Sequence, residues 1–171
     1  MKFQELAAER YSCRQMTDQK VDDKLIEHLI ETAILAPTAV NKQPFKIFWM
    51  KSDEAKEAIH KVTRFTFGAD TFLVIGSKKE DGWVRSFDNH SFAEVDASIV
   101  ATHIMMDITD LGLATTWVGY FDAPLLKSLR PEMEDYELIA IFPIGYAADG
   151  NGAPSPRHTV RKSREDLVEY L

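Results

Sequence analysis

Two arginines and a hydroxyl alternate near the start of the chain, in the segment Arg10-Tyr11-Ser12-Cys13-Arg14. In an extended backbone the side chains at positions 10, 12 and 14 point to the same side. Two guanidinium groups and a hydroxyl would then share one volume, and a guanidinium binds a phosphate dianion through paired hydrogen bonds. The pattern predicts a phosphate cradle, and the alternative on the same spacing is a solvated basic turn.

A second segment, APTAVNKQPF (36–45), brackets small and amide residues between two prolines. Prolines restrict the backbone, so the Asn41 and Gln43 amides can be held in place. Amides both donate and accept hydrogen bonds, which suits the mixed edge of a flavin or pyrimidine ring. The alternative is a rigid helix-to-strand connector with an asparagine turn.

Two later segments also carry chemistry. In GLATTWVG (112–119) two glycines flank a small-residue strand that contains Trp117, and such a strand lets a planar ligand approach the backbone. The alternative there is a core strand with one packed tryptophan. RHTVRKSR (157–164) holds four of the chain's 20 lysines and arginines, which fits either a terminal phosphate partner or an exposed basic tail.

The hydrophobic pattern supplies the elements that must position these segments. Helical spacing predicts about five helices and a short final one, and apolar runs predict four strands. The expected helices are 2–9, 23–35, 53–62, 94–111 and 123–130, with the final helix after Ser163; the expected strands are 45–51, 71–77, 115–119 and 137–147. The polar stretch 78–92 is expected to be a loop over a site. Because helices and strands do not alternate regularly, the fold class is α+β.

Bulk composition limits the function classes. The 171 residues suit a single domain (1–171), and the net charge of −7 argues against nucleic acid or a membrane surface as partner. No apolar stretch suggests a signal peptide or a membrane span, so we expect a cytoplasmic protein. The one cysteine, Cys13, is expected to be a packing residue, and no Cys/His spacing suggests a metal site. The GxGxxG, P-loop, GxSxG and HExxH motifs are not found in the sequence.

Taken in order, the four segments resemble the nitroreductase family. The matching pieces are ERYSCR near the start, APTAVNKQPF, the stretch from Asp96 to GLATTWVG, FPIGYA, and a closing RK followed by EDLVEYL. The resemblance implies an α+β fold with a central, mostly antiparallel sheet flanked by helices. It also implies an intertwined homodimer with two flavin mononucleotide (FMN) sites, each built from both subunits.

The resemblance also implies roles for individual residues. Arg10, Ser12 and Arg14 would hold the phosphate and ribityl chain, with Tyr11 beside them. The isoalloxazine ring would face Pro37, Thr38, Ala39 and Asn41 of the other subunit, and Trp117, Val118 and Gly119 would line its other side. Arg161 matches the family's late phosphate-binding residue, with Lys162 as the alternative. No residue is assigned as catalytic, and Ala39 and Lys42 depart from the residues the family often carries.

The implied activity is an FMN-dependent oxidoreductase. NADH or NADPH would deliver hydride to flavin N5 and leave before a nitroaromatic or quinone-type acceptor took its place. The alternatives are the same fold with another reaction, such as reductive dehalogenation or flavin modification, a flavin carrier without efficient turnover, and a small interaction domain without a cofactor.

Overall fold

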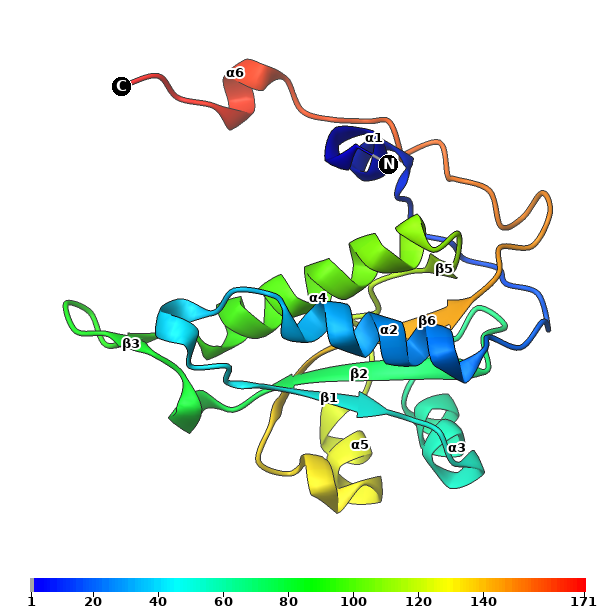
Figure 1. The fold of residues 1–171 in the computed structure, drawn as a ribbon, viewed down its shortest axis with the longest axis horizontal. Coiled ribbons are helices and arrows are strands. Elements are labelled where there is room, and N and C mark those ends of the chain that lie inside the picture. Colours follow the sequence, from blue (N-terminus) through cyan, green and yellow to red (C-terminus); the bar gives the residue numbers. More distant parts are fainter. Residues whose placement is uncertain (1) are drawn as a thin grey trace.

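A four-stranded sheet forms the centre of the molecule in the computed structural model, which describes residues 2–171. Its strands are β1 (Phe45–Trp49), β2 (Thr71–Ser77), β5 (Ala114–Thr115) and β6 (Glu137–Gly145). They lie in the order β1-β2-β6-β5, and every neighbouring pair is antiparallel (Figure 1). The expected α+β fold with a mostly antiparallel sheet is confirmed.

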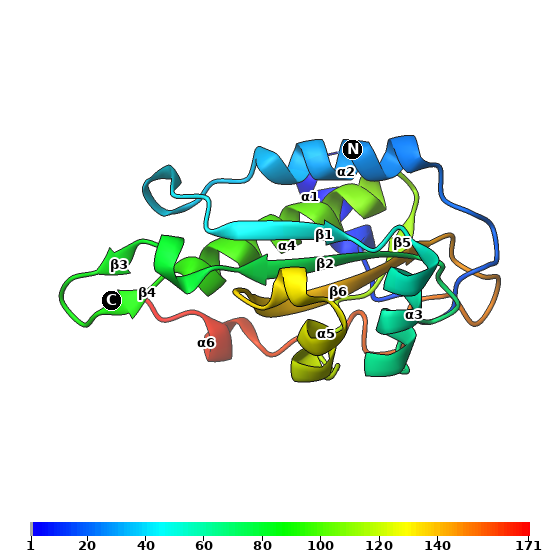
Figure 2. The same ribbon diagram turned by 90° about the horizontal axis from the view of Figure 1, so that it is seen from below.

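Helices cover both faces of this sheet. The helices α2 (Asp23–Ile34) and α4 (Ala93–Asp110) lie on one face, and α3 (Asp53–Val62) and α5 (Ala123–Leu129) lie on the other (Figures 1 and 2). Successive side chains of β2 therefore enter two different cores: Leu73 and Ile75 pack with α2 and α4, whereas Phe72 and Val74 pack with α3 and α5. Burial on both faces explains why the strand carries an unbroken apolar run, FLVI (72–75).

Side-chain caps begin the helices where the sequence predicts them. The carboxylate of Asp22 accepts a hydrogen bond from the Lys24 N–H at 2.9 Å, and Asp122 accepts one from Leu125 at 2.9 Å. Ser163 caps the short helix α6 (Arg164–Leu167) in the same way. These bonds satisfy N–H groups that have no partner inside a helix.

The expected strand 115–119 is wrong in its extent. The ladder between β5 and β6 stops after Thr115 and resumes as a single bridge between Val118 and Ile141. The next residue of β6 in this register is Pro143, which has no N–H to donate to the ladder. Thr115 compensates because its hydroxyl donates to the Pro143 carbonyl at 2.7 Å.

The expected loop 78–92 is also wrong, because it contains regular structure. A short turn η2 (Lys79–Asp81) leads into a hairpin of β3 (Val84–Arg85) and β4 (His90–Ser91), which projects from the body (Figure 1). The rings of Trp83 and Phe92 meet edge to face at 5.2 Å across the base of the hairpin. Strands of two residues are too short to produce an alternating sequence pattern.

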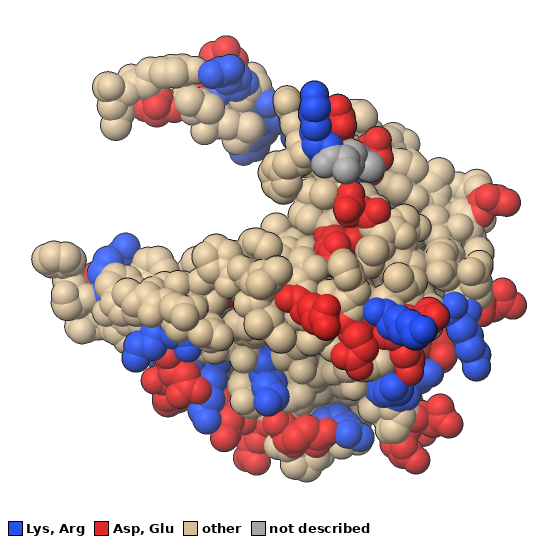
Figure 3. All heavy atoms as spheres, in the orientation of Figure 1, with Lys and Arg blue, Asp and Glu red and all other residues tan. Residues whose placement is uncertain are grey.

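Two further segments lie outside the sheet, one at each end of the chain (Figure 1). Helix α1 (Phe3–Glu9) packs on α4, and after β6 the chain runs as an extended segment, 148–171, which we call the C-terminal arm. In Figure 3 an open groove separates this arm from the body of the molecule. The two remaining turns are η1 (Ala39–Asn41) and η3 (Pro131–Met133). Within residues 2–171, no helix has the length and apolar character needed to cross a membrane.

Candidate cofactor site

Two segments almost 150 residues apart meet in one basic hollow of about 270 Å³. One wall comes from the residues after α1 and the other from the C-terminal arm. The lining residues, which define what we call the basic hollow, are Arg10, Tyr11, Ser12, Arg14, Ser155, Arg157, His158 and Arg161. The structure thus brings together all five predicted phosphate-side residues, and of the pair Arg161 and Lys162 only Arg161 lines the hollow.

The segment 10–14 is held against the sheet by Cys13. Helix α1 ends at Glu9. The N–H of the next residue, Arg10, still bonds to the Leu6 carbonyl, but the Arg10 backbone has left the helical conformation. The Cys13 N–H then donates to the Thr115 carbonyl of β5 at 2.9 Å, and its side chain is 1% exposed. With Cys13 directed inward, its neighbours Ser12 and Arg14 are left to face the hollow, as alternation in an extended backbone requires. The packing role expected for Cys13 agrees with this burial.

The C-terminal arm is fastened to the same segment at its root. The Ala148 N–H donates to the Gln15 carbonyl at 3.0 Å, and the Gly152 N–H donates to the Ala148 carbonyl at 2.9 Å. Further along, a ring nitrogen of His158 lies 3.1 Å from the carbonyl oxygen of Ala8. These contacts fix the arm side of the hollow relative to its α1 side.

Side chains inside the hollow also support one another. The rings of Tyr11 and His158 meet edge to face with centroids 6.1 Å apart. Arg161 donates to the carbonyl oxygens of His158 and Val160, at 2.7 and 2.8 Å. Arg14 donates to the Ser12 carbonyl at 3.2 Å. Backbone acceptors therefore orient the guanidinium groups of Arg14 and Arg161, and each group keeps further N–H donors for a ligand.

The hollow carries positive charge in an acidic protein. Its lining contains four arginines and no carboxylate, and none of the four forms an ion pair within residues 2–171. Burial, and to a lesser degree the neighbouring Cys13, raises the pKa of the Tyr11 phenol. Tyr11 therefore stays neutral at physiological pH and can donate a hydrogen bond. An anion with several acceptor oxygens, such as a phosphate monoester, matches this set of donors.

The connector between α2 and β1 lies elsewhere in the chain. Because segment 10–22 precedes α2 and residues 35–44 follow it, the two lie at opposite ends of that helix (Figures 1 and 2). The predicted ring-facing residues Pro37, Thr38, Ala39 and Asn41 therefore do not line the basic hollow of their own chain. Pro37 and Asn41 are exposed, and Thr38 and Ala39 are partly exposed.

Trp117, Val118 and Gly119 follow the β5 strand to which Cys13 is bonded, but they do not line the basic hollow. Val118 is 4% exposed and exchanges both backbone hydrogen bonds with Ile141, so it offers a ligand little surface. Trp117 is partly exposed and meets Phe142 edge to face at 5.4 Å. Gly119 is exposed, and a Cβ atom there would have nothing within 4 Å.

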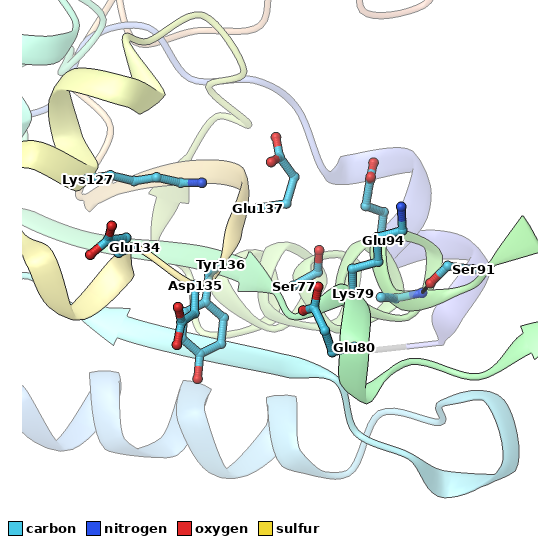
Figure 4. A pocket seen from close by; sticks show the side chains of 11 residues that line it. Ser77, Lys79, Glu80, Ser91, Glu94, Lys127, Glu134, Asp135, Tyr136 and Glu137 are labelled. Carbon is cyan, nitrogen blue, oxygen red and sulfur yellow. Dashed lines mark hydrogen bonds between the residues drawn. The ribbon is translucent and has the colours of Figure 1, made fainter.

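A second hollow, of about 380 Å³, has the opposite charge. Figure 4 shows it at the end of β2 and the start of β6, lined by five carboxylates and two lysines: Glu80, Glu94, Glu134, Asp135, Glu137, Lys79 and Lys127. An excess of carboxylates repels a phosphate group. The described residues also contain no group of three His, Cys, Asp or Glu side chains that could hold a metal ion. Of these two hollows, the basic one has the charge that attracts a phosphate group.

Sequence reasoning missed Ser155 and underrated two residues of the arm. Arg157 and His158 belong to the basic segment 157–164, but the sequence pattern assigns neither of them an individual role in a site. The structure places His158 against Tyr11 in the basic hollow. The signal for His158 is its place inside this basic segment, whereas Ser155 lies in a linker whose composition carries no such signal.

Comparison with known proteins agrees with this geometry. A sequence model of the nitroreductase family matches residues 7–64 and 61–146. The crystal structure of a nitroreductase family protein from Clostridium difficile is 31% identical, with a TM-score of 0.91 over 99% of this chain and 98% of that one. A nitroreductase from Desulfovibrio desulfuricans, crystallised in complex with FMN, shares the fold at 20% identity, with a TM-score of 0.79 over 100% of this chain and 97% of that one.

Two sequence relatives carry different names. A protein of Archaeoglobus fulgidus described as an NADH dehydrogenase/NAD(P)H nitroreductase is 26% identical over 82% of both chains. An iodotyrosine dehalogenase 1 homologue of Caenorhabditis elegans is also 26% identical, over 86% of this chain. This chain spans only 55% of the length of that homologue.

The antiparallel sheet between two helical layers defines an α+β protein, and the basic hollow at its margin presents positively charged hydrogen-bond donors. With the family match over most of its length, the chain belongs to the nitroreductase family of oxidoreductases. The resemblance seen in the sequence is confirmed, while the homodimer and the single domain over 1–171 stay predictions.

Proposed function

We propose that the protein binds FMN and uses NADH or NADPH to reduce nitroaromatic or quinone-type acceptors. The observation that carries this proposal is the basic hollow, where two distant segments place four arginines, two serines, a tyrosine and a histidine around one space. The FMN complex of the Desulfovibrio desulfuricans protein and the name of the Archaeoglobus fulgidus relative support the cofactor and the reductant.

Arg10, Ser12, Arg14 and Arg161 would hold the FMN phosphate, and Tyr11 would donate to the phosphate or ribityl oxygens. Each hydrogen bond to a charged group contributes about 1.5–3 kcal/mol, so several together suffice for tight binding. When bound, FMN itself supplies the hydride chemistry, and the protein provides position and electrostatics. No side chain of the hollow needs to act as an acid or base, so we assign no catalytic residue.

The ring would be enclosed by two copies of the chain. Within one chain the ring-facing connector lies at the far end of α2 from the hollow, so only a second copy can bring Thr38, Ala39 and Asn41 over the ring. Exposed apolar side chains on the arm, among them Leu167 and Tyr170, and on α1, where Phe3 is 73% exposed, support such a partner. Gly119 and Trp117 would line the other side of the ring.

Reductive dehalogenation is the second candidate reaction, and the relative from Caenorhabditis elegans is the observation that favours it. It uses the same flavin site, so the residues of the basic hollow keep their roles. A panel of nitroaromatic, quinone and halogenated phenol acceptors, assayed without oxygen, separates the two reactions. A flavin carrier without turnover would bind one FMN per site, but its flavin absorbance would decrease only slowly after addition of NADH or NADPH.

The test uses FMN and riboflavin on the purified protein. Riboflavin lacks only the phosphate, so we expect it to bind at least about 100-fold more weakly, which corresponds to about 2.7 kcal/mol. Arg14→Ala should weaken FMN binding by about 1–3 kcal/mol and leave riboflavin binding unchanged. Lys162→Ala is the control for loss of a positive charge, because Lys162 is next to Arg161 in the basic segment 157–164 but outside the hollow. A protein that binds neither flavin would refute the proposal.

A further inference from the structure

One carboxylate in the core reaches the connector between α2 and β1. Asp96, in the first turn of α4, is 2% exposed. Its Oδ1 atom accepts a hydrogen bond from the Ala39 N–H at 2.9 Å, across 57 residues of sequence. Its other oxygen, Oδ2, is buried and has no hydrogen-bond partner among residues 2–171. Burying a carboxylate oxygen without a hydrogen-bond partner costs free energy of folding, so the position of Asp96 calls for a structural explanation.

The connector it reaches has an unfavourable backbone. Val40, Asn41 and Gln43 have φ angles of 46°, 57° and 52°, in the left-handed region that non-glycine residues seldom adopt. Such residues cost of order 1–3 kcal/mol each and persist only where their surroundings hold them. A β-branched residue such as Val40 is especially disfavoured there.

Few contacts hold this backbone in place. Val40 is 72% exposed, so its side chain does not pack in its own chain. The Gln43 N–H donates to the Thr38 hydroxyl at 3.0 Å, and the Gln43 amide donates to Asn41, but all three residues belong to the connector itself. The bond from Ala39 to Asp96 is the side-chain hydrogen bond that ties the connector to the buried α4 helix.

We propose that Asp96 is a positioning residue that sets the shape of the connector and thereby controls the flavin site of the other subunit. The inference rests on the proposed function, in which the connector covers the partner's FMN ring. Asp96 never touches that FMN; its carboxylate fixes the Ala39 amide, and Ala39 begins the left-handed turn. Each chain would then contribute to both flavin sites of the dimer. Its arginines would bind the phosphate in one site, and its Asp96 would position the connector that covers the ring in the other.

Two substitutions separate hydrogen bonding from folding. Asp96→Ala removes the acceptor, and we expect FMN to bind about 10-fold more weakly, as follows from losing about 1.4 kcal/mol of positioning. Asp96→Asn keeps an oxygen acceptor for the Ala39 N–H and should restore most of the affinity. Asp107→Ala is the matched control, because Asp107 is also on α4 but pairs with His28 at 3.4 Å. The control should lose stability without losing FMN.

Mixed dimers test whether Asp96 acts across the interface. The mixed dimer combines one Arg14→Ala chain with one Asp96→Ala chain. If Asp96 acts on the site of the other subunit, both substitutions affect the site that contains the altered Arg14. The other site then keeps its arginines and an intact connector. Such a dimer should bind one FMN with wild-type affinity. Action in cis would damage both sites once, and neither would bind at wild-type strength, which would overturn the inference.

The outcomes also separate this inference from the function on which it rests. Wild-type protein that binds FMN, together with Asp96→Ala protein that binds it equally well, overturns the role of Asp96 alone. Wild-type protein that binds no FMN overturns both. Hydrogen exchange at the Ala39 amide gives a readout without flavin: it should accelerate in Asp96→Ala, stay slow in Asp96→Asn and be unaffected in Asp107→Ala.

Discussion

Gly152→Ala should displace the C-terminal arm from the segment 10–14, which forms the other side of the basic hollow. A Cβ atom at position 152 would lie 2.2 Å from the Ala148 carbonyl oxygen, 2.6 Å from the Ala148 nitrogen and 2.9 Å from the Gln15 carbonyl oxygen. Ordinary contact begins at 3.4 Å, so the backbone must retreat by about 1.2 Å, the difference between 3.4 and 2.2 Å. All three atoms belong to the backbone, which cannot swing aside as a flexible side chain does.

The cost can be estimated from these contacts. Overpacking costs typically 1–3 kcal/mol, and the displaced bond from Gly152 to Ala148 contributes about 1 kcal/mol more. For a protein of this size each kcal/mol lowers the melting temperature by about 2–4 °C, so we expect a fall of about 4–16 °C. FMN affinity should fall at least about 10-fold, because the arm carries Arg161 and a misplacement of about 1 Å weakens positioned contacts.

Thermal unfolding and FMN titration of the same preparations measure both effects. Gly119→Ala is the control for stability, since a Cβ atom there meets nothing within 4 Å, and its melting temperature should stay within about 2 °C of wild type. A Gly152→Ala protein with wild-type melting temperature and wild-type FMN affinity would show that the root of the arm is not rigid, and the reasoning would fail.

Three other predictions follow from residues of the same region. Gly119→Ala should keep its stability yet bind FMN more weakly, because the new methyl group would occupy space against which we place the ring; equal affinity by titration removes Gly119 from the site. Cys13→Ala should lose about 1–2 kcal/mol of stability by denaturant unfolding, from the cavity left under the segment 10–14, while bleaching with NADH remains; loss of bleaching in a folded variant would assign the thiol a redox role. Tyr11 has a raised pKa in the folded state, so its contribution to stability is complete below pH 10 and is lost as the pH rises through the folded pKa. Tyr11→Phe should therefore lose less stability than wild type above pH 10 in thermal scans, and identical pH profiles would contradict the assignment.

Local chemistry made most elements predictable from the sequence. The sequence predicts helix α2 because its apolar residues recur at helical spacing after a capping Asp22, and the structure confirms both the helix and its cap. The break in β5 was not predictable from its own residues, since it is caused by Pro143 on the neighbouring strand. The hairpin at 84–91 was missed because its strands are two residues long and its aromatic contacts join residues outside them.

The candidate site was predictable in its parts but not in its assembly. Alternation around Cys13 correctly anticipates that Ser12 and Arg14 face one space, and the basic composition of 157–164 anticipates Arg161 there. No local pattern places Ser155 in the same hollow as Tyr11, because that depends on how the chain leaves β6. Likewise, Asp96 looks like an ordinary helix residue until the fold brings Ala39 beside it. Distant pairs of this kind are set by tertiary structure.

The pairing of β2 with β6 has a consequence for how the chain reaches its native state. Residues 71–77 find their main partner at 137–145, so about sixty residues must be made before the middle of the sheet can close. Closing so long a loop is entropically costly, and topologies with distant strand pairs fold slowly. During synthesis the apolar strand TFLVIGS emerges from the ribosome with one side unpaired, and this interval is when the chain is most exposed to aggregation. Substitutions that weaken β6 would therefore reduce the yield of folded protein before they alter any property of the folded state.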